Sequence, residues 1–301
     1  MRVILIAQSF TKGGAATGAK NLSSALKSVG IECVELDASR ILEKSFFLKL
    51  IRIFERIMER IIGGKEVHFL KFGSYTIDLP MLITNYKPDI IQLCDISSNV
   101  INPFYPKNIR VPIFHRLSDF WPYCGGYHYP QNFSLKKYLI EICFKVFIRK
   151  KRANKYFLVC PSKWLLENLS NDFKKIYIRN AIEIRDIKPK SLNLKEKIRL
   201  GFISKDLFLE RKGLKKLISL LNILQIGYEI NLLLYGKCKR NINCLNKKIN
   251  IKIKNTYKKN DLKDVFESFD MLVCPSKYDN SPNALIEALS FGVPVIAQEG
   301  S

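Results

Sequence analysis

Short apolar runs alternate with segments of helical periodicity along most of the chain, and this alternation limits the folds open to it. The strand-like runs occur at residues 2–7, 32–36, 88–93, 111–114, 155–159, 176–179, 198–203, 229–235, 250–253, 271–274 and 293–297. Helical segments lie between many of them, at residues 15–29, 213–224 and 262–269 and after residues 163 and 281. Parallel neighbours in a sheet need a crossover connection, usually a helix. The pattern therefore predicts an α/β fold with mainly parallel sheets.

We interpret a polar stretch without clear periodicity, residues 184–197, as a linker. It separates a first Rossmann-like domain, residues 1–183, from a second one, residues 198–301. Two such domains predict a cleft, with ligands at the carboxyl ends of the strands. A doubly wound domain that begins at residue 198 normally has a further strand and helices, so we expect the second domain to be incomplete at its C-terminal end.

The chain carries 50 Lys and Arg against 27 Asp and Glu, a formal net charge of +23. Such an excess suits nucleic acid, an anionic membrane or an anionic substrate, so the charge alone does not separate these partners. No segment matches a recognised DNA-binding motif, and we expect no nucleic-acid partner. The 8 cysteines form no C-x-x-C pair and no cluster with His, which argues against a disulfide framework and against a zinc site.

The sequence has no run of about 18 uncharged apolar residues and no signal peptide before its first strand, so we expect a cytoplasmic protein. Two basic amphipathic segments, residues 40–62 and 135–152, predict peripheral contact with the inner face of the membrane. In the first segment the apolar face is formed by Phe47, Leu50, Ile51, Phe54, Ile57, Met58 and Ile61. Core-packed helices with solvated basic faces are the alternative.

The segment from Cys274 to Ala297 follows a pattern of strand, polar loop, helix, glycine turn and strand. Its loop carries the carboxylate of Asp279. We predict that Ser281 caps the helix and that Pro282 occupies its first position. The N–H groups at the start of a helix, placed after a strand, form a site for anionic ligands. Because the helix carries a second carboxylate, Glu287, the segment predicts a phosphate site flanked by two acids.

Two further loops between strand and helix are candidates for phosphate contact. Residues 202–213 contain three cations, Lys205, Arg211 and Lys212, which suit a diphosphate. Solvated surface side chains are the alternative for this loop. Residues 11–18 contain Gly13 and Gly14, where a ligand can approach the backbone closely, although a plain tight turn would have the same composition.

Residues 114–129 combine two histidines, an aspartate, an arginine and several aromatic side chains after a strand. Aromatic faces beside hydrogen-bonding groups suit sugar rings, whereas an ordered loop packed on the core is the alternative. His115 lies at the strand end, where ligand contacts cluster, and is a candidate for binding. We expect a structural role for His128.

Taken together, these motifs resemble those of the family-4 glycosyltransferases of the GT-B fold, most closely the branch that builds bacterial capsule, exopolysaccharide or O-antigen. The resemblance rests first on the pattern Pro275-Ser-x-x-Asp279, Pro282-Asn283, Glu287-Ala and Gly292-x-Pro294-Val295. It is supported by the Gly13-Gly14 turn, by Arg211-Lys212-Gly213 and by the Trp121-Pro, Gly125-Gly126 and His128-Tyr129 pairs.

The resemblance implies a retaining transfer of a sugar from a nucleoside diphosphate donor, with UDP or GDP as the nucleotide, and with neither a metal nor another cofactor. The acceptor would be a lipid-linked saccharide on the side of the first domain, and the donor would bind the second domain. An inactive or partial paralogue that binds nucleotide or an anionic membrane is the alternative, motivated by the end of the chain at Ser301.

The resemblance also implies roles for single residues. Glu287 would bind the ribose, Asp279 the hydroxyls of the donor sugar, and Lys212 the departing diphosphate. The remaining members of the implied site are Gly13, Gly14, His115, Arg211, Asn280, Pro282, Asn283 and Ala284. Two departures stand out: the first carboxylate is Asp rather than the more common Glu, and Gly201-Phe202 replaces a Gly-Arg pair. The second cation must then be Lys205 or Arg211, and we prefer Lys205 because it lies nearer the end of the strand.

Overall fold

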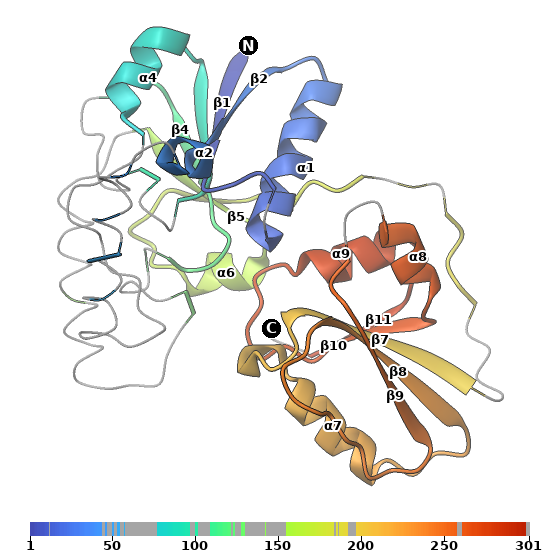
Figure 1. Cartoon of the computed structure of the whole chain (residues 1–301). Coiled ribbons are helices and arrows are strands. Elements are labelled where there is room, and N and C mark those ends of the chain that lie inside the picture. Colours follow the sequence, from blue (N-terminus) through green and yellow to red (C-terminus); the bar gives the residue numbers. More distant parts are fainter. Residues whose placement is uncertain are drawn as a thin grey trace. The chain divides into compact units, whose positions relative to one another are not determined.

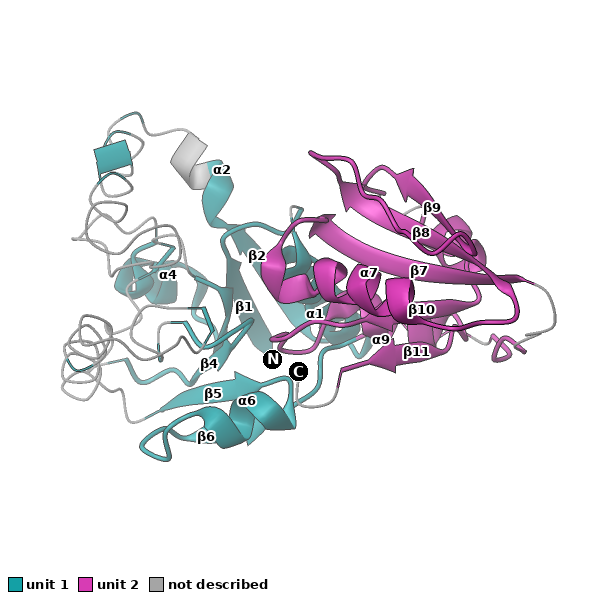
Figure 2. Cartoon of the chain, turned by 90° about the horizontal axis from the view of Figure 1, so that it is seen from below, with its two compact units in different colours: residues 1–181 teal, residues 182–301 magenta. Residues whose placement is uncertain are grey.

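The computed structural model describes residues 1–11, 13–43, 77–96, 100–101, 109–121, 123, 128–129, 155–183, 185, 187–191, 197–257 and 261–298, with residues 46, 50, 53–54, 57 and 142. The chain divides into two compact units, Met1–Ala181 and Ile182–Ser301. Each unit contains one parallel sheet with helices packed on it (Figure 1). Figure 2 shows the two units in different colours.

The first unit is built on a six-stranded sheet with the order β2-β1-β3-β4-β5-β6. Its strands are β1 (Arg2–Ala7), β2 (Glu32–Asp37), β3 (Ile90–Asp95), β4 (Ile113–Arg116), β5 (Tyr156–Cys160) and β6 (Lys175–Tyr177), and all neighbours are parallel. The chain passes from β1 to β2 on one side and later to β3 on the other side. The strand order therefore reverses between β1 and β3, where α/β sheets commonly bind ligands.

The helices of the first unit cover both faces of this sheet. They are α1 (Gly14–Ser28), α2 (Ala38–Glu43), α4 (Leu79–Tyr86) and α6 (Lys163–Asn168). Successive residues of a strand face opposite sides of the sheet. Val3 and Leu5 of β1 accordingly pack with α1, whereas Ile4 and Ile6 pack with α2 and α4. This burial on both faces explains the uninterrupted apolar run that predicted the strand.

The second unit is built on a five-stranded parallel sheet with the order β11-β10-β7-β8-β9. Its strands are β7 (Lys197–Asp206), β8 (Glu229–Lys237), β9 (Ile249–Lys254), β10 (Met271–Cys274) and β11 (Val295–Ala297). The chain continues from β7 to β8 and β9 on one side, and β10 then returns to the other side of β7. The switch point of this sheet therefore lies between β7 and β10.

Helices also cover both faces of the second sheet. They are the 3₁₀ turn η1 (Glu210–Lys212) and the α-helices α7 (Leu214–Ile223), α8 (Leu262–Glu267) and α9 (Asn283–Ser290). The apolar side of α7 packs on one face with Phe202 and Leu232, and α8 and α9 pack on the other face with Leu272. Strand β9 forms one edge of the sheet and carries two exposed lysines, Lys252 and Lys254.

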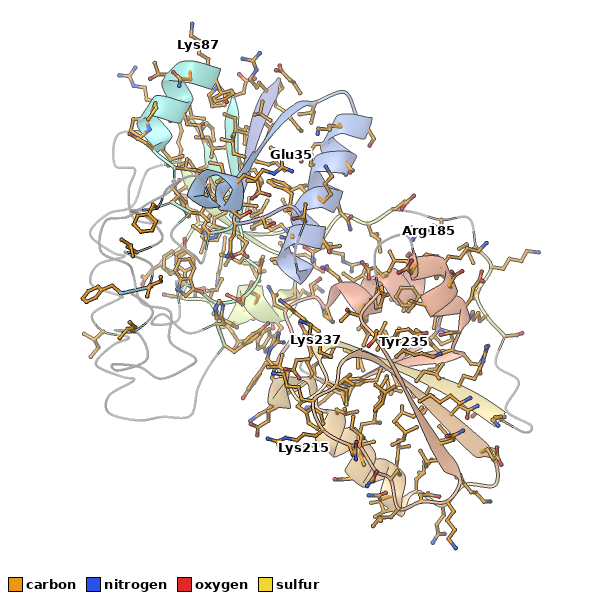
Figure 3. The ribbon with its side chains drawn as sticks, in the orientation of Figure 1. Glu35, Lys87, Arg185, Lys215, Tyr235 and Lys237 are labelled. Atoms are coloured by element: carbon orange, nitrogen blue, oxygen red, sulfur yellow. The ribbon has the colours of Figure 1, made fainter. Side chains whose placement is uncertain are left out.

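The described residues of the predicted linker, residues 184–197, are attached to the second unit. The ammonium of Lys190 donates to the carbonyls of Phe266 and Phe269, both at 2.8 Å. The guanidinium of Arg185 (labelled in Figure 3) lies 4.1 Å from the ring centre of Phe291. These charged tips therefore bind at the carboxyl end of α8 and beside α9, where cations are favourable. A charged sequence without periodicity gave no sign of this packing.

The predicted strands and their parallel arrangement are confirmed, with bounds that differ by a few residues. Helix α4 was not predicted, because its apolar sequence has no clear periodicity over so few residues. Most of the predicted membrane segments, 40–62 and 135–152, falls outside the described residues. None of the helices in the described part of the chain is long and apolar enough to cross a membrane.

Candidate functional site

Two loops meet at the carboxyl ends of β7 and β10, at the switch point of the second sheet. One follows β7 and contains Arg211 and Lys212, and the other follows β10 and contains Asp279. The backbone N–H of Lys277 donates to the carbonyl of Arg211 at 2.7 Å. The Nη1 atom of Arg211 in turn donates to the carbonyl of Tyr278 at 3.3 Å. The structure thus brings together predicted residues that are far apart in the sequence.

Asp279 occupies the centre of this cluster and is only 8% exposed. Its Oδ2 atom accepts a hydrogen bond from Nζ of Lys212, with which it forms an ion pair. Oγ of Ser276 lies 3.4 Å from the same oxygen, and Nη1 of Arg211 lies 3.8 Å from it. Because an unpaired buried charge costs about 3 to 5 kcal/mol, each partner holds the other in place.

Gly213 sets the distance between the two loops. It lies between η1 and α7, as the C-cap of η1 and the N-cap of α7, with a φ of 77° in the left-handed region. A Cβ atom at this position would lie 2.2 Å from the carbonyl oxygen of Pro275. Glycine therefore allows both the backbone turn and the close approach that positions Lys212 against Asp279.

Helix α9 begins beside Asp279, but not as the sequence predicted. Its N-cap is Pro282, with an extended ψ of 120°, and the helix has no side-chain cap. Ser281 adopts a φ of 81°, so the prediction that Ser281 caps the helix was wrong. The first bonds within the helix run from the N–H groups of Leu285 and Ile286 to the carbonyl of Pro282.

The N–H groups of Asn283 and Ala284 precede these bonds. They therefore lie at the positive end of the helix dipole, as an anion site requires. Asn280, in the loop just before the helix, is only 3% exposed. Glu287 lies one turn into α9 and is half-buried. Burial raises the pKa of Tyr257, and the negative charge of Glu287 raises it further.

Lys205 lies near the end of β7, where the pairing with β8 shifts its register between Ile203 and Asp206. Its side chain is exposed. In the described part of the chain, the ion pairs of Asp279 are with Lys212 and Arg211. Arg211 is thus the second cation beside this carboxylate, and a role for Lys205 stays a prediction.

In the first unit, Gly13 is the N-cap of α1 and has a φ of 95°. Gly14 begins the helix and is exposed. The N–H of Thr17 donates to the carbonyl of Gly13 at 3.1 Å, which closes the first turn. The turn follows β1 at the switch point of the first sheet, so its position is compatible with the predicted ligand contact.

His115 is buried in β4, with 2% of the residue exposed. Its Nδ1 atom lies 3.0 Å from the hydroxyl of Tyr156 and 3.2 Å from that of Tyr123. Burial lowers the pKa of His115 to about 3, and the positive charge of Arg116 adds to the shift. His115 is therefore a neutral imidazole at pH 7, held by two tyrosines that sequence reasoning did not select. Its contact with a ligand stays a prediction.

The loop after β4 is tied by a second pair. Nδ1 of His128 lies 2.6 Å from Oδ2 of Asp119, and Oδ1 of Asp119 accepts from the N–H of Trp121 at 2.9 Å. These contacts agree with the structural role expected for His128. Among the described residues there is no group of three or more His, Cys, Asp or Glu side chains that could hold a metal ion.

Residues 184–301 match a family model described as "Glycosyl transferases group 1". The matched residues cover nearly all of the second unit, which is similar to this family. The cluster around Asp279 and the start of α9 both lie within the matched residues. No curated protein sequence matches the chain.

Solved structures of glycosyltransferases resemble the whole chain in fold. Sucrose-phosphate synthase from Thermosynechococcus elongatus has 14% sequence identity and a TM-score of 0.60, covering 99% of this chain and 81% of that chain. The lipopolysaccharide outer core galactosyltransferase WaaB has 13% identity and a TM-score of 0.55, with coverages of 99% and 80%. Alr3699/HepE of Anabaena, in complex with UDP-glucose, has 13% identity and a TM-score of 0.51, with coverages of 99% and 80%.

Likenesses at this level of identity establish the fold. The chain has the α/β fold of the GT-B glycosyltransferases, with two parallel sheets, which confirms the predicted fold class. The predicted resemblance is confirmed in part, by the match of residues 184–301 to the group 1 model and by the GT-B fold. The assignment to family 4 and to the capsule and O-antigen branch stays a prediction.

Proposed function

We propose that the chain is a retaining glycosyltransferase that moves a sugar from a nucleoside diphosphate donor to a lipid-linked saccharide in surface polysaccharide synthesis. The observation that carries this proposal is the Lys212–Asp279 pair, which lies at the switch point of the second sheet, within the residues that match the group 1 model, beside the start of α9. The resemblance of the fold to a lipopolysaccharide galactosyltransferase also supports it.

In the proposed reaction, the bond between the sugar and the diphosphate breaks, and negative charge develops on the departing phosphate oxygen. The ammonium of Lys212 and the N–H groups of Asn283 and Ala284 would stabilise this charge where it develops. Asp279 would accept hydrogen bonds from the sugar hydroxyls, and Glu287 would accept them from the ribose. We propose that these fixed groups do the work without a metal ion.

Lys212 forms an ion pair with Asp279 in the structure. We expect this pair to rearrange once the donor binds. A diphosphate carries more negative charge than a carboxylate and would compete for the ammonium. Asp279, still beside Arg211 at 3.8 Å, would then turn its second oxygen to the sugar. Donor binding and alignment of the sugar would thereby be coupled through one ion pair.

Thermal unfolding with a panel of nucleotides tests the donor site. The structure of Alr3699/HepE contains UDP-glucose, so UDP-sugars are the first candidates, followed by GDP-sugars. A ligand at 100 times its Kd should raise stability by about 2.7 kcal/mol. We expect this gain with one nucleotide family in the wild type and in Lys215→Ala, and its loss in Glu287→Ala. Lys215 is a matched control because it is an exposed lysine on α7 (Figure 3).

Two outcomes would count against the proposal. If no nucleotide stabilises a chain that unfolds cooperatively, the donor site is not functional. If nucleotide binds but no sugar reaches a lipid-linked acceptor, the chain is better explained as an inactive paralogue that binds nucleotide. Where transfer does occur, the anomeric configuration of the product, measured by NMR, decides whether the reaction is retaining.

We further propose that the protein binds the inner face of the membrane through residues 40–62. Five described residues of this segment are helical, apolar and 49–76% exposed, namely Phe46, Leu50, Ile53, Phe54 and Ile57. Their spacing places them along one side of a helix. Basic residues of the same segment, such as Arg52 and Arg56, supply the charge that anionic lipids attract.

Sedimentation with vesicles tests this contact. We expect wild type to bind vesicles that contain phosphatidylglycerol, and we expect the double variant Phe46→Ser/Phe54→Ser to bind at least about 100-fold more weakly, since each buried aromatic side chain contributes about 1.5 to 3 kcal/mol. Leu245→Ser is the control, because Leu245 is an 84% exposed apolar residue of the second unit. If the wild-type protein stays in the supernatant with anionic vesicles at low salt, this proposal is wrong.

A further inference from the structure

Arg116 is a buried guanidinium in the first unit with one unused donor. It ends β4, and only 6% of the residue is exposed. Its Nε atom donates to Oδ1 of Asn180 at 2.9 Å. Within the described part of the chain, its Nη1 atom is buried and has no hydrogen-bond partner. A buried charged donor without a partner is rare in folded proteins, since it loses its water without a replacement.

A second buried polar atom without a partner lies two residues further on. This atom is Oγ of Ser118, again judged within the residues that the structure describes. The N–H of Leu117 donates to the carbonyl of Val159, so the chain continues alongside β5 beyond Arg116. Nη1 of Arg116 and Oγ of Ser118 are therefore two buried donors without partners among the described residues, within three residues at the carboxyl end of β4.

The place of this pair in the fold is a common site of ligand contact. The guanidinium lies against α1, and a Cβ atom on Gly18 would lie 2.2 Å from Nη2 of Arg116. Helix α1 begins at Gly14, one turn before Gly18, next to the switch point of the first sheet. Burial lowers the pKa of Arg116, and the nearby carboxylate of Asp95 opposes this effect. The arrangement holds a cation at the carboxyl ends of the strands.

We propose that Nη1 of Arg116 and Oγ of Ser118 bind an anionic oxygen of the acceptor substrate, carried by a phosphate or a carboxylate group. A guanidinium forms strong, directional hydrogen bonds to such oxygens, and a serine hydroxyl supplies one more. The inference rests on the proposed function, which assigns the phosphates of the donor to Lys212 in the other unit. The acceptor would therefore be an acidic saccharide or one with a phosphate close to the sugar that reacts.

Thermal unfolding of the full chain with simple anions tests this site. The probes are inorganic phosphate, glucose 1-phosphate and glucuronate, with glucose as the uncharged reference. We expect phosphate-bearing or carboxylate-bearing probes to stabilise the wild type. The probe that stabilises it most identifies the anionic group that the site binds. Ser118→Ala should raise the apparent Kd of the effective probe by about tenfold, as the loss of a hydrogen bond to a charged group does.

Two more variants act on the guanidinium. Arg116→Lys keeps the positive charge but loses the planar guanidinium with its paired N–H donors. Gly18→Ala places a methyl group against Nη2 of Arg116. Both should weaken the same probe by at least tenfold, whereas Arg110→Lys, at an exposed arginine of the same unit, should not. Because Arg116→Lys alters a buried residue, Ser118→Ala keeps the test valid if that variant unfolds.

The outcomes separate this inference from the proposed function. UDP-sugar affinity should be unchanged in Ser118→Ala and Arg116→Lys. If these variants weaken UDP-sugar binding instead, the pair serves the donor and the inference is overturned. It is also overturned if no anion stabilises wild type, or if Ser118→Ala and wild type respond equally. If no nucleotide stabilises the wild type but the anion probes still do, the result would count against the proposed function and not against this inference.

Discussion

Replacing Lys212 with alanine is expected to lower kcat for sugar transfer by about 100- to 1,000-fold, the loss typical of a group that stabilises charge in the transition state. The ammonium of Lys212 is fixed by Asp279, so it needs little rearrangement before a diphosphate departs. Lys215→Ala, at an exposed lysine on the neighbouring helix α7, should retain full activity. Steady-state kinetics with the donor found by thermal unfolding measures both variants.

The same substitution has a structural effect that must be separated from the chemical one. Without Lys212, the ion pair that the buried carboxylate of Asp279 keeps within the described residues is the longer one to Arg211, at 3.8 Å. If Lys212 served only to neutralise Asp279, the double variant Lys212→Ala/Asp279→Asn would have the same stability and the same kcat as Asp279→Asn alone. We expect the double variant to match Asp279→Asn in stability but to have a lower kcat. Activity within about twofold of wild type in Lys212→Ala would contradict the proposed role.

Replacing Gly213 with alanine is expected to lower the free energy of unfolding of the second unit by at least about 2 kcal/mol, because a residue with a side chain is strained at positive φ. The new Cβ atom would also lie 2.2 Å from the carbonyl oxygen of Pro275. Relief of this clash would separate the two loops, so donor binding should weaken as well.

Gly227→Ala is the matched control, since a Cβ atom on Gly227 meets nothing within 4 Å. The sequence has 2 tryptophans, Trp121 and Trp164, and both belong to the first unit. Tryptophan fluorescence therefore does not report on the second unit. Hydrogen exchange of peptides from residues 197–257 in increasing denaturant gives the local stability. Equal effects of the two alanine substitutions would show that the turn at Gly213 is not under strain.

The alternation of apolar runs and helices was enough to predict both sheets, because strands buried on two faces have continuous apolar sequences. The sequence was less informative where charged side chains bind backbone groups. The sequence around Lys190 predicts a linker, yet the ammonium of Lys190 donates hydrogen bonds to two carbonyls near α8. Serine is a preferred residue for a helix N-cap. Ser281 nevertheless has a positive φ, and Pro282 is the N-cap instead.

The candidate site also contains some residues that the sequence could predict and others that it could not. Asp279 and Lys212 could be selected from the sequence, since their loops follow neighbouring strands of a predicted parallel sheet. The partners of His115 could not, because Tyr123 and Tyr156 reach it only through the fold. The unused donor of Arg116 likewise becomes visible only when Gly18 and Asn180 are placed around it. Pairs of this kind depend on packing between elements, and no local pattern encodes them.

The lysines at the edge of the second sheet affect how copies of the protein meet. An exposed edge strand offers unpaired N–H and carbonyl groups to any other extended chain. Strand β9 is such an edge, and Lys252 and Lys254 project from it. Two copies that approached edge to edge would bring like charges together, which disfavours the growth of intermolecular sheets. Part of the large positive charge of the chain thus acts as protection against aggregation, whatever ligands the protein binds.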